Sequence, residues 1–234
     1  MFDPRQIKAF TFDTGGTVLD WHTGFKEGFE KLDFYEKNGF KSDEMANLFR
    51  KKSLEIITSQ GDNKELVNFD TAHRMALEQI LIEKKIKLDT EDIKFLSYEV
   101  PANLKVWEDF LIPFEELRQK ILCVSFTLLS NRLVFLNSKV NKINWDLILS
   151  CETLEVYKPN INAYLKTAKM LQLNPEECVM VACHSFDLNA AKKAGFNTVF
   201  VKRINEWGTD TKISIDGNYD MVIEDFNELK EIFD

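Results

Sequence analysis

Asp13 ends an apolar run and is followed closely by two glycines, within the stretch IKAFTFDTGGTVLDW of residues 7–21. A carboxylate placed there is presented at the open edge of a sheet, where a substrate can reach it. It could act as a nucleophile, with the loop amides from Thr14 to Gly16 binding an anion beside it. It could equally be a turn residue that caps the glycine loop. Gly15 occupies the position where a phosphate-handling version of this motif would place a second aspartate.

Polar residues also follow two later apolar runs. Ser130 and Asn131 come directly after residues 124–129. Their hydroxyl and amide would hold a carboxylate or a leaving group if this strand end faces Asp13, although Ser-Asn is also common turn chemistry. Lys158 precedes a proline, which stiffens the backbone beside it. A lysine close to a carboxylate would keep that carboxylate ionised and neutralise an incoming anion.

His184 is one of three histidines in the chain, and it follows the apolar run VMVAC. An acid stands three residues later, at Asp187. An imidazole at a strand end with a neighbouring carboxylate is a candidate general base, because its ordinary pKa lies close to neutrality. We therefore expect Asp13, Ser130, Lys158 and His184 to meet at one edge of a sheet.

Alternating strands and helices are the elements that must position these side chains. Such alternation predicts an α/β fold, with a parallel sheet covered on both faces. Between residues 21 and 100 the pattern turns helical, with a helix start at Ser42, so we expect an inserted helical cap domain over a core made of residues 1–20 and 101–234. The expected strands are 7–12, 122–129, 147–150, 178–182, 198–201 and 221–223, and the expected core helices are 160–171 and 188–194.

The composition is that of a soluble globular protein, with 44% hydrophobic and 29% charged residues. A net charge of −8 argues against nucleic acid or an anionic membrane as partner. The chain shows neither a signal-peptide pattern nor an apolar run long enough to span a membrane. Four scattered cysteines read as reduced thiols, so we predict a cytoplasmic protein. Apolar helices in the cap favour a homodimer.

We predict no metal site and no cofactor. A hard divalent cation prefers several oxygen ligands. Gly15 and Cys183 stand at two positions where such ligands would be expected, which leaves only Asp13 and Asp187 to hold an ion.

These segments together resemble the haloacid dehalogenase superfamily, and within it the type II L-2-haloacid dehalogenases. The resemblance rests on FDTGGTVLDW, LLSN, YKPN and VMVACHSFDLNAAKKAGF, which match the four family motifs in order, and on VKRINEWG near the end. It implies a Rossmann-like core with a helical cap. It also implies a small-molecule 2-haloacid as substrate.

The resemblance assigns further roles residue by residue. Arg50, in LFRKKSLE, matches the arginine that receives the halide. Leu54 and Phe69 match residues that line the substrate pocket, with Phe186 replacing the usual aromatic before the last aspartate. Tyr164 matches a tyrosine near the active-site lysine.

Three departures from the family pattern stand out. Gly15 replaces an aromatic pocket residue, so we expect a pocket of altered shape. Lys51 replaces a common glutamine after the arginine. His184 replaces an asparagine of the best-known branch, which suggests another way of activating water.

The resemblance implies a two-step hydrolysis. Asp13 attacks C2 of an L-2-haloacid while Arg50 stabilises the departing halide, and water then cleaves the ester to release a D-2-hydroxyacid. Neutral His184 serves as base, oriented by Asp20 or by Asp187. Two alternatives remain open at this point. One is a Mg²⁺-dependent phosphatase of the same superfamily, and the other is a catalytically silent binding protein that kept the fold.

Overall fold

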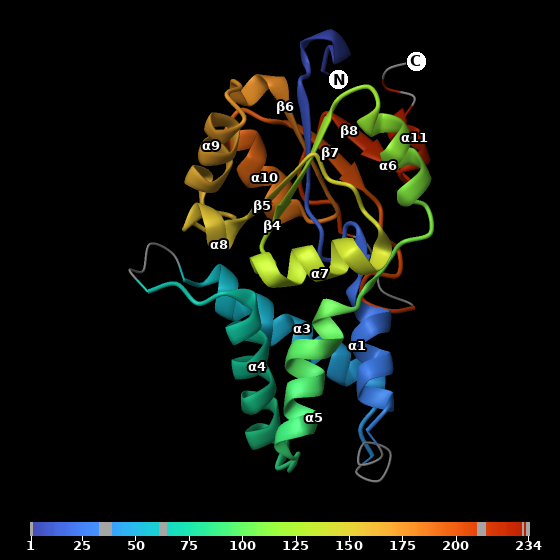
Figure 1. Cartoon of the computed structure of the whole chain (residues 1–234), viewed down its shortest axis with the longest axis vertical. Helices are drawn as coiled ribbons and strands as arrows, with labels where there is room; N and C mark the ends of the chain where they lie inside the picture. Colours follow the sequence, from blue (N-terminus) through green and yellow to red (C-terminus); the bar gives the residue numbers. More distant parts are fainter. Residues whose placement is uncertain (1, 33–38, 61–64, 210–213, 231, 233–234) are drawn as a thin grey trace.

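The structure is a computed structural model that describes residues 2–32, 39–60, 65–209, 214–230 and 232. Its centre is a six-stranded parallel sheet in the order β5-β4-β1-β6-β7-β8 (Figure 1). β1 lies in the middle, so the residue that follows it is flanked by the ends of β4 and β6. The strands are β1 (Ala9–Phe12), β4 (Leu122–Thr127), β5 (Leu147–Ser150), β6 (Cys178–Ala182), β7 (Asn197–Val201) and β8 (Met221–Ile223).

Helices cover both faces of this sheet, as expected for parallel strands that are buried on both sides. In Figure 1, α8 and α9 lie on one side of the sheet, and α6 and α11 lie on the other. The helices of this layer are α6 (Leu111–Arg118), α7 (Asn131–Asn141), α8 (Cys151–Leu154), α9 (Ile161–Met170), α10 (Ser185–Lys193) and α11 (Asn227–Lys230), with short 3-10 turns η1 (Pro4–Gln6) and η4 (Pro175–Glu177). The predicted parallel α/β fold is confirmed.

A second layer of helices is inserted between β1 and β4 and lies below the sheet in Figure 1. A two-stranded antiparallel ribbon joins the layers, formed by β2 (Leu19–Asp20) and β3 (Lys105–Val106). The helices of this layer are α1 (Trp21–Glu30), α3 (Ser42–Thr58), α4 (Phe69–Lys84), α5 (Thr90–Lys94), η2 (Phe95–Glu99) and η3 (Val100–Ala102). α3 begins at Ser42 as predicted.

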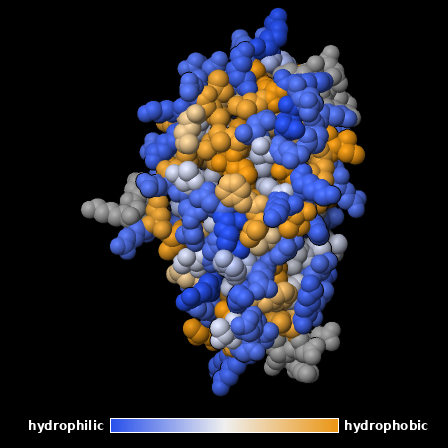
Figure 2. All heavy atoms as spheres, in the orientation of Figure 1, coloured by the Kyte–Doolittle hydropathy of each residue, from blue (hydrophilic) through white to orange (hydrophobic). Residues whose placement is uncertain are grey.

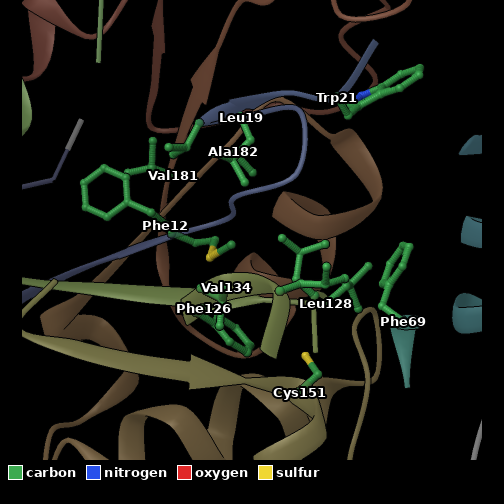
Figure 3. Close-up of a cluster of buried hydrophobic side chains, with 14 of the residues drawn as sticks. Phe12, Leu19, Trp21, Phe69, Phe126, Leu128, Val134, Cys151, Val181 and Ala182 are labelled. Atoms are coloured by element: carbon green, nitrogen blue, oxygen red, sulfur yellow. The ribbon is translucent and has the colours of Figure 1, made fainter. Parts of the chain in front are cut away.

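Aromatic packing stabilises the sheet layer. Phe12, the last residue of β1, packs against Phe110, Phe114 and Trp145, with ring centroids 5.6 to 6.3 Å apart. Where the layers meet, Phe69 of the helical layer points toward Leu128 just after β4 (Figure 3). Both side chains are buried, so the interface between the layers is apolar at this point.

Most strand boundaries agree with the sequence prediction, and β5, β6 and β8 agree at both ends. β4 stops at Thr127 rather than at residue 129. Its last hydroxyl there accepts a hydrogen bond from the amide of Leu129 at 3.0 Å, which turns the chain out of the strand. The short ribbon β2/β3 carries too few residues for a period-two pattern and was not predicted.

Some apolar side chains reach the surface. On the face shown in Figure 2, hydrophobic and hydrophilic residues alternate over the sheet layer. Phe135, Leu136 and Val140 of α7 are exposed, and so is Ile112 of α6. The homodimer stays a prediction. In the described part of the chain, no helix is both long and apolar enough to span a membrane.

Candidate active site

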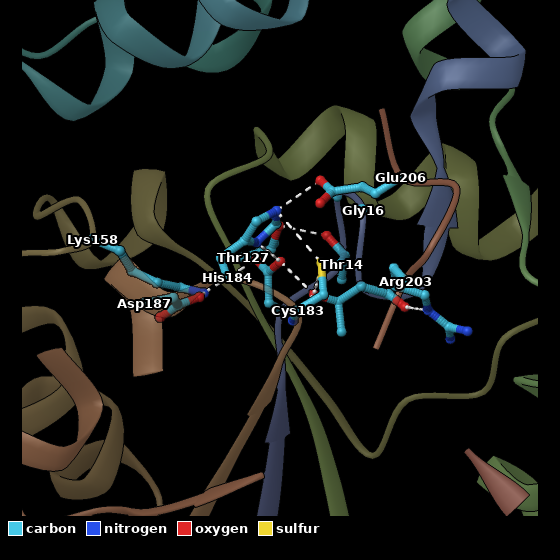
Figure 4. A network of polar contacts seen from close by, with 12 residues as sticks. Thr14, Gly16, Thr127, Lys158, Cys183, His184, Asp187, Arg203 and Glu206 are labelled. Carbon is cyan, nitrogen blue, oxygen red and sulfur yellow. Dashed lines mark hydrogen bonds and ion pairs between the residues drawn. The ribbon is translucent and has the colours of Figure 1, made fainter. Parts of the chain in front are cut away.

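Figure 4 shows a polar network that includes Lys158, His184 and Glu206. Asp13, the residue after β1, belongs to this network. Its Oδ1 contacts Nζ of Lys158 at 3.3 Å. Its Oδ2 accepts a hydrogen bond from Oγ1 of Thr17 at 2.8 Å and lies 3.2 Å from Nδ1 of His184. The strand-end prediction is therefore confirmed for Asp13, Lys158 and His184.

Asp13 is held as a carboxylate although it is only 4% exposed. Burial by itself raises the pKa of a carboxyl group, because the charged form loses its hydration. The ammonium of Lys158 and the hydrogen bonds from His184 and Thr17 outweigh this effect and lower the pKa of Asp13 below its ordinary value. A buried, ionised carboxylate at the edge of a sheet is a nucleophile with little solvent to displace.

Lys158 joins two carboxylates. Its Nζ lies 2.6 Å from Oδ2 of Asp187 as well as 3.3 Å from Asp13. The hydroxyl of Tyr164 donates to the other oxygen of Asp187 at 2.6 Å. Burial alone would lower the pKa of Lys158, but the two carboxylates raise it, so the side chain is an ammonium. Tyr164 is fully buried behind Asp187, so it positions that carboxylate instead of binding substrate as the resemblance implied.

His184 bridges Asp13 and a carboxylate that the sequence analysis did not single out. Its Nε2 lies 2.8 Å from Oε1 of Glu206, in the loop after β7. Neither predicted partner is correct. Asp20 caps α1, where its Oδ1 accepts the amide hydrogen of Thr23 at 3.0 Å, and Asp187 is taken by Lys158 and Tyr164.

The expectation of a neutral imidazole is also wrong for the free enzyme. Burial disfavours the charged ring, but Cys183, Glu206 and the hydrogen bond to Asp13 together raise the pKa of His184 well above its ordinary value. Each ring nitrogen faces a carboxylate, so both carry protons that are donated. His184 therefore stands as an imidazolium between two carboxylates.

The raised pKa of His184 predicts how its contribution to stability depends on pH. A raised pKa means that folding favours the protonated ring, so the stabilisation is full below the unfolded-state pKa of about 6.5 and is lost as pH rises through the folded-state value. The stability of the wild type over His184→Asn should therefore shrink above pH ~6.5, by up to about 1.4 kcal/mol per pH unit. Urea unfolding across pH measures this.

His22 provides the opposite control. Its pKa is lowered, mainly by burial. Its protonation is therefore disfavoured in the folded state, and the wild type should lose stability relative to His22→Asn as pH falls below about 6.5. The same slope for both variants would contradict the assignment of an imidazolium at His184.

A small cavity opens in front of Asp13. The structure confirms the position of several predicted pocket residues, since Leu54, Phe69 and Phe186 all line it together with Gly15. Its free volume of about 10 Å³ is roughly what one water needs. A substrate larger than water would therefore need the lining side chains to move apart. The full lining is Asp13, Gly15, Arg50, Leu54, Phe69, Thr127, Leu128, Leu129, His184 and Phe186.

Arg50 lies across this cavity from Asp13. It is 4% exposed, and its Nη2 donates to the carbonyl oxygen of Gly15 at 3.0 Å. The guanidinium lies 5.4 Å from the ring of Trp21 and 5.7 Å from that of Phe69. A Cβ at position 15 would meet Nη2 at 3.2 Å, so the glycine provides room for the guanidinium. The nucleophile and a cation thus line the same small pocket.

Ser130 and Asn131 lie outside this pocket, contrary to the prediction that they hold the substrate. The Ser130 hydroxyl donates to Asp70 of α4 and accepts the amide hydrogen that starts α7. The side-chain Oδ1 of Asn131 accepts a hydrogen bond from Thr153 Oγ1 at 2.7 Å. The Thr14 hydroxyl is hydrogen-bonded to that of Thr127 at 2.6 Å, and the binding of substrate by the Thr14 amide stays a prediction.

Two functional side chains were missed in the sequence analysis. Thr17 stands four residues after Asp13, and its hydroxyl both donates to Asp13 and accepts from the amide of Cys183. Glu206 contacts His184 from 22 positions away. The position of Thr17 in the first motif was a usable signal, and so was the position of Glu206 in the VKRINEWG segment that carries part of the resemblance.

Gly16 leaves space for the pair formed by His184 and Glu206. Its φ of +98° is a conformation that side chains rarely adopt, and a Cβ there would lie 2.4 Å from Oε1 of Glu206. Gly16→Ala should therefore destabilise the fold by about 1 to 3 kcal/mol, from strain plus overlap. Gly39 also has a positive φ but has open space around it, so Gly39→Ala should cost only about 1 kcal/mol in urea unfolding. Equal losses for the two variants would show that the overlap with Glu206 contributes nothing.

Within the described residues, one group could offer several ligands to a metal ion, namely Cys183, His184 and Glu206, whose ligand atoms lie within 4.8 Å of one another. A hydrogen bond of 2.8 Å already joins Nε2 of His184 to Glu206, and an ion could enter only by breaking it. Between Asp13 and Asp187, where a Mg²⁺ ion would need oxygen ligands, lies the ammonium of Lys158. Neither arrangement fits a resident divalent ion.

A parallel sheet with an aspartate after its first strand, and an inserted helical layer that closes over it, defines a class of hydrolases. The family model of haloacid dehalogenase-like hydrolases matches residues 7–195. The chain belongs to this family.

Individual relatives narrow the comparison. The chain is 26% identical to (S)-2-haloacid dehalogenase 4A of Burkholderia cepacia over 207 residues, which is 84% of each protein. The crystal structure of a defluorinating L-2-haloacid dehalogenase is similar with a TM-score of 0.86 and 27% identity, over 99% of this chain and 98% of that one. An L-2-haloacid dehalogenase from Xanthobacter autotrophicus with chloropropionic acid covalently bound shares the fold, with a TM-score of 0.83 and 18% identity over 97% of this chain and 98% of that one.

Proposed function

We propose that this chain hydrolyses L-2-haloacids to D-2-hydroxyacids through an ester on Asp13, without a metal. The observation that carries the proposal is the small pocket lined by both the ionised carboxylate of Asp13 and the buried guanidinium of Arg50. A carboxylate nucleophile and a cation for the leaving halide are what substitution at C2 requires. The relatives named above support this choice of substrate.

In the first step, an oxygen of Asp13 attacks C2, the carbon–halogen bond breaks, and its electron pair leaves with the halide toward Arg50. Oδ2 already receives hydrogen bonds from Thr17 and His184, which occupy its two lone-pair directions. Among the described residues, Oδ1 has one polar side-chain contact, to Nζ of Lys158 at 3.3 Å. Oδ1 therefore keeps a free lone pair and is the attacking oxygen.

In the second step, water adds to the carbonyl carbon of the Asp13 ester. Asp187 takes the proton of the water, since burial raises the pKa of its carboxyl group despite the neighbouring ammonium. The bond between the acyl carbon and Oδ1 then breaks. Lys158 gives a proton to the departing alkoxide oxygen and regains one from Asp187. The new Asp13 carboxyl group loses its proton to solvent, so the net products are hydroxyacid, halide and one proton.

The chain's layers would serve this chemistry as two domains. We propose residues 21–100 as a cap and residues 1–20 and 101–234 as a core, supported by the helical layer between β1 and β4 and the ribbon that joins it to the sheet. Asp70 of α4, which binds Ser130 and Arg132 of the core, would hold the cap closed. A cytoplasmic location remains part of the proposal.

Halide release tests the proposed function. L-2-chloropropionate should give stoichiometric chloride and D-lactate in the presence of a chelator, whereas the D-enantiomer should give neither. Hydrolysis of p-nitrophenyl phosphate that depends on Mg²⁺, without any halide release, would instead support the phosphatase alternative.

A further inference from the structure

The arrangement around Oδ2 of Asp13 has a second consequence, which rests on the proposed function. Two donors converge on this one oxygen, Oγ1 of Thr17 at 2.8 Å and Nδ1 of His184 at 3.2 Å. When water adds to the Asp13 ester, the negative charge develops on the carbonyl oxygen. If Oδ1 is the attacking oxygen, that carbonyl oxygen is Oδ2. Two preorganised donors on the oxygen that becomes negative form an oxyanion site.

We propose that His184 and Thr17 form the oxyanion site for hydrolysis of the Asp13 ester, and that Glu206 is the positioning residue that keeps His184 a charged donor. This assigns His184 a role different from that of a general base. It also assigns a role to Glu206, which contacts neither Asp13 nor the pocket in front of it.

Glu206 is built into the site to hold His184. Its Oε1 accepts hydrogen bonds from Nε2 of His184 at 2.8 Å and from Nε1 of Trp21 at 3.0 Å. The side chain is 6% exposed, and Gly16 leaves the space that it fills. His184 lines the substrate pocket and also a second cavity of about 340 Å³, whereas Glu206 lines only the second one. Glu206 thus reaches the ester through His184, although its charge also attracts that of Arg50.

The charge of Glu206 matters most after the ester has formed. In the free enzyme two carboxylates hold the imidazolium, those of Asp13 and Glu206. Ester formation removes the charge of Asp13, and Glu206 is then the carboxylate left against the ring. The other groups that face this site are Cys183, beside the ring, and Arg50, across the pocket. Without the charge of Glu206, His184 would lose its extra proton at a lower pH and become a neutral imidazole, which is a weaker donor to Oδ2 than the imidazolium.

Hydrolysis of the Asp13 ester balances in atoms and electrons when His184 and Thr17 act as donors. The oxygen of water bonds to the acyl carbon, the π electrons of the carbonyl move onto Oδ2, and the proton of water goes to Asp187. The hydrogen bonds from Nδ1 and Oγ1 shorten but transfer no proton. When the intermediate collapses, the C–Oδ1 bond breaks and the electrons on Oδ2 restore the double bond.

Glu206→Gln tests the proposal, because it keeps the shape and the acceptor oxygen but removes the charge. Mixed with L-2-chloropropionate, the variant should release one halide per site at close to the wild-type rate. Steady-state turnover should then fall about 100-fold, the usual cost of weakening one oxyanion donor. Intact-protein mass spectrometry of acid-quenched samples should show the ester accumulating on Asp13. Glu224→Gln, which alters an exposed carboxylate paired with Lys202, should behave as wild type.

The pH profile separates an oxyanion donor from a base. A charged donor must be an imidazolium, so turnover should decline as pH rises. In Glu206→Gln this decline should begin at a lower pH than in the wild type. A base must be unprotonated, and removing the carboxylate would then extend activity toward lower pH. Thr17→Val should also accumulate the ester, and Thr17→Ser should restore turnover by keeping the hydroxyl.

Three outcomes would overturn the role of His184 and Glu206 and leave the proposed function intact. The first is unchanged turnover in Glu206→Gln. The second is an equal loss of the halide burst and of turnover without accumulation of the ester, and the third is a pH profile shifted as expected for a base. Absence of halide release from the wild type would overturn the proposed function itself, and this inference with it. The burst in the variant also shows that its site is folded.

Discussion

Replacing Asp13 with asparagine is expected to lower halide release by about 10⁴-fold or more, because removing a covalent nucleophile eliminates the pathway that the rest of the site serves. Asparagine has nearly the same shape and can still accept the hydrogen bond from Thr17, so the loss should come from chemistry and not from packing. No ester should form on the variant. Halide release under single-turnover conditions, together with the mass of the intact protein, measures both effects.

Asp20→Asn is the matched control for this variant. The substitution is the same and lies seven residues away, but Asp20 caps α1, where asparagine is as good a cap as aspartate. Its turnover should equal that of the wild type, which would also support Glu206 over Asp20 as the partner of His184. Halide release by Asp13→Asn at more than a tenth of the wild-type rate would contradict the nucleophile assignment.

Lys158→Met should have the largest effect on folding. The substitution leaves the carboxylates of Asp13 and Asp187 buried without the ammonium that now contacts both. Removing one member of a buried ion pair costs about 3 to 5 kcal/mol, because the remaining charge is neither hydrated nor compensated. Urea unfolding at neutral pH should show this loss, and the loss should diminish at acid pH as the carboxyl groups take up protons.

Lys193→Met provides the comparison, since Lys193 is exposed at the end of α10. Surface substitutions of this kind change stability by no more than about 0.5 kcal/mol. If Lys158→Met were as stable as Lys193→Met, the ion pairs around Asp13 would not be holding the site together.

The sequence predicted the parts of the site that depend on chain topology. Asp13 and His184 could be brought together because each directly follows an apolar strand, and Lys158 because it comes soon after another, since parallel strands end at one edge of the sheet. Arg50 belongs to α3 and not to a strand end, so the rule about the ends of parallel strands could not predict its position. The resemblance to a family did. Its position across the pocket from Asp13 agrees with that expectation.

The partners of these side chains could not be predicted in the same way. Ser130 is bound to Asp70, 60 positions earlier, and His184 to Glu206 in a loop. Such contacts depend on how the layers pack and on the space left by Gly16, neither of which local periodicity records. The protonation of His184 follows from those contacts, so the expectation of a neutral ring failed for the same reason.

One measurement tests the ester mechanism most directly. The enzyme is placed in heavy-oxygen water with less than one equivalent of L-2-chloropropionate, and the label is located after a single turnover. If hydrolysis proceeds through the Asp13 ester, the label enters the carboxylate of Asp13, and the first D-lactate released carries oxygen from the enzyme. Label appearing first in the lactate, with none in Asp13, would show that water attacks C2 directly and would contradict the account.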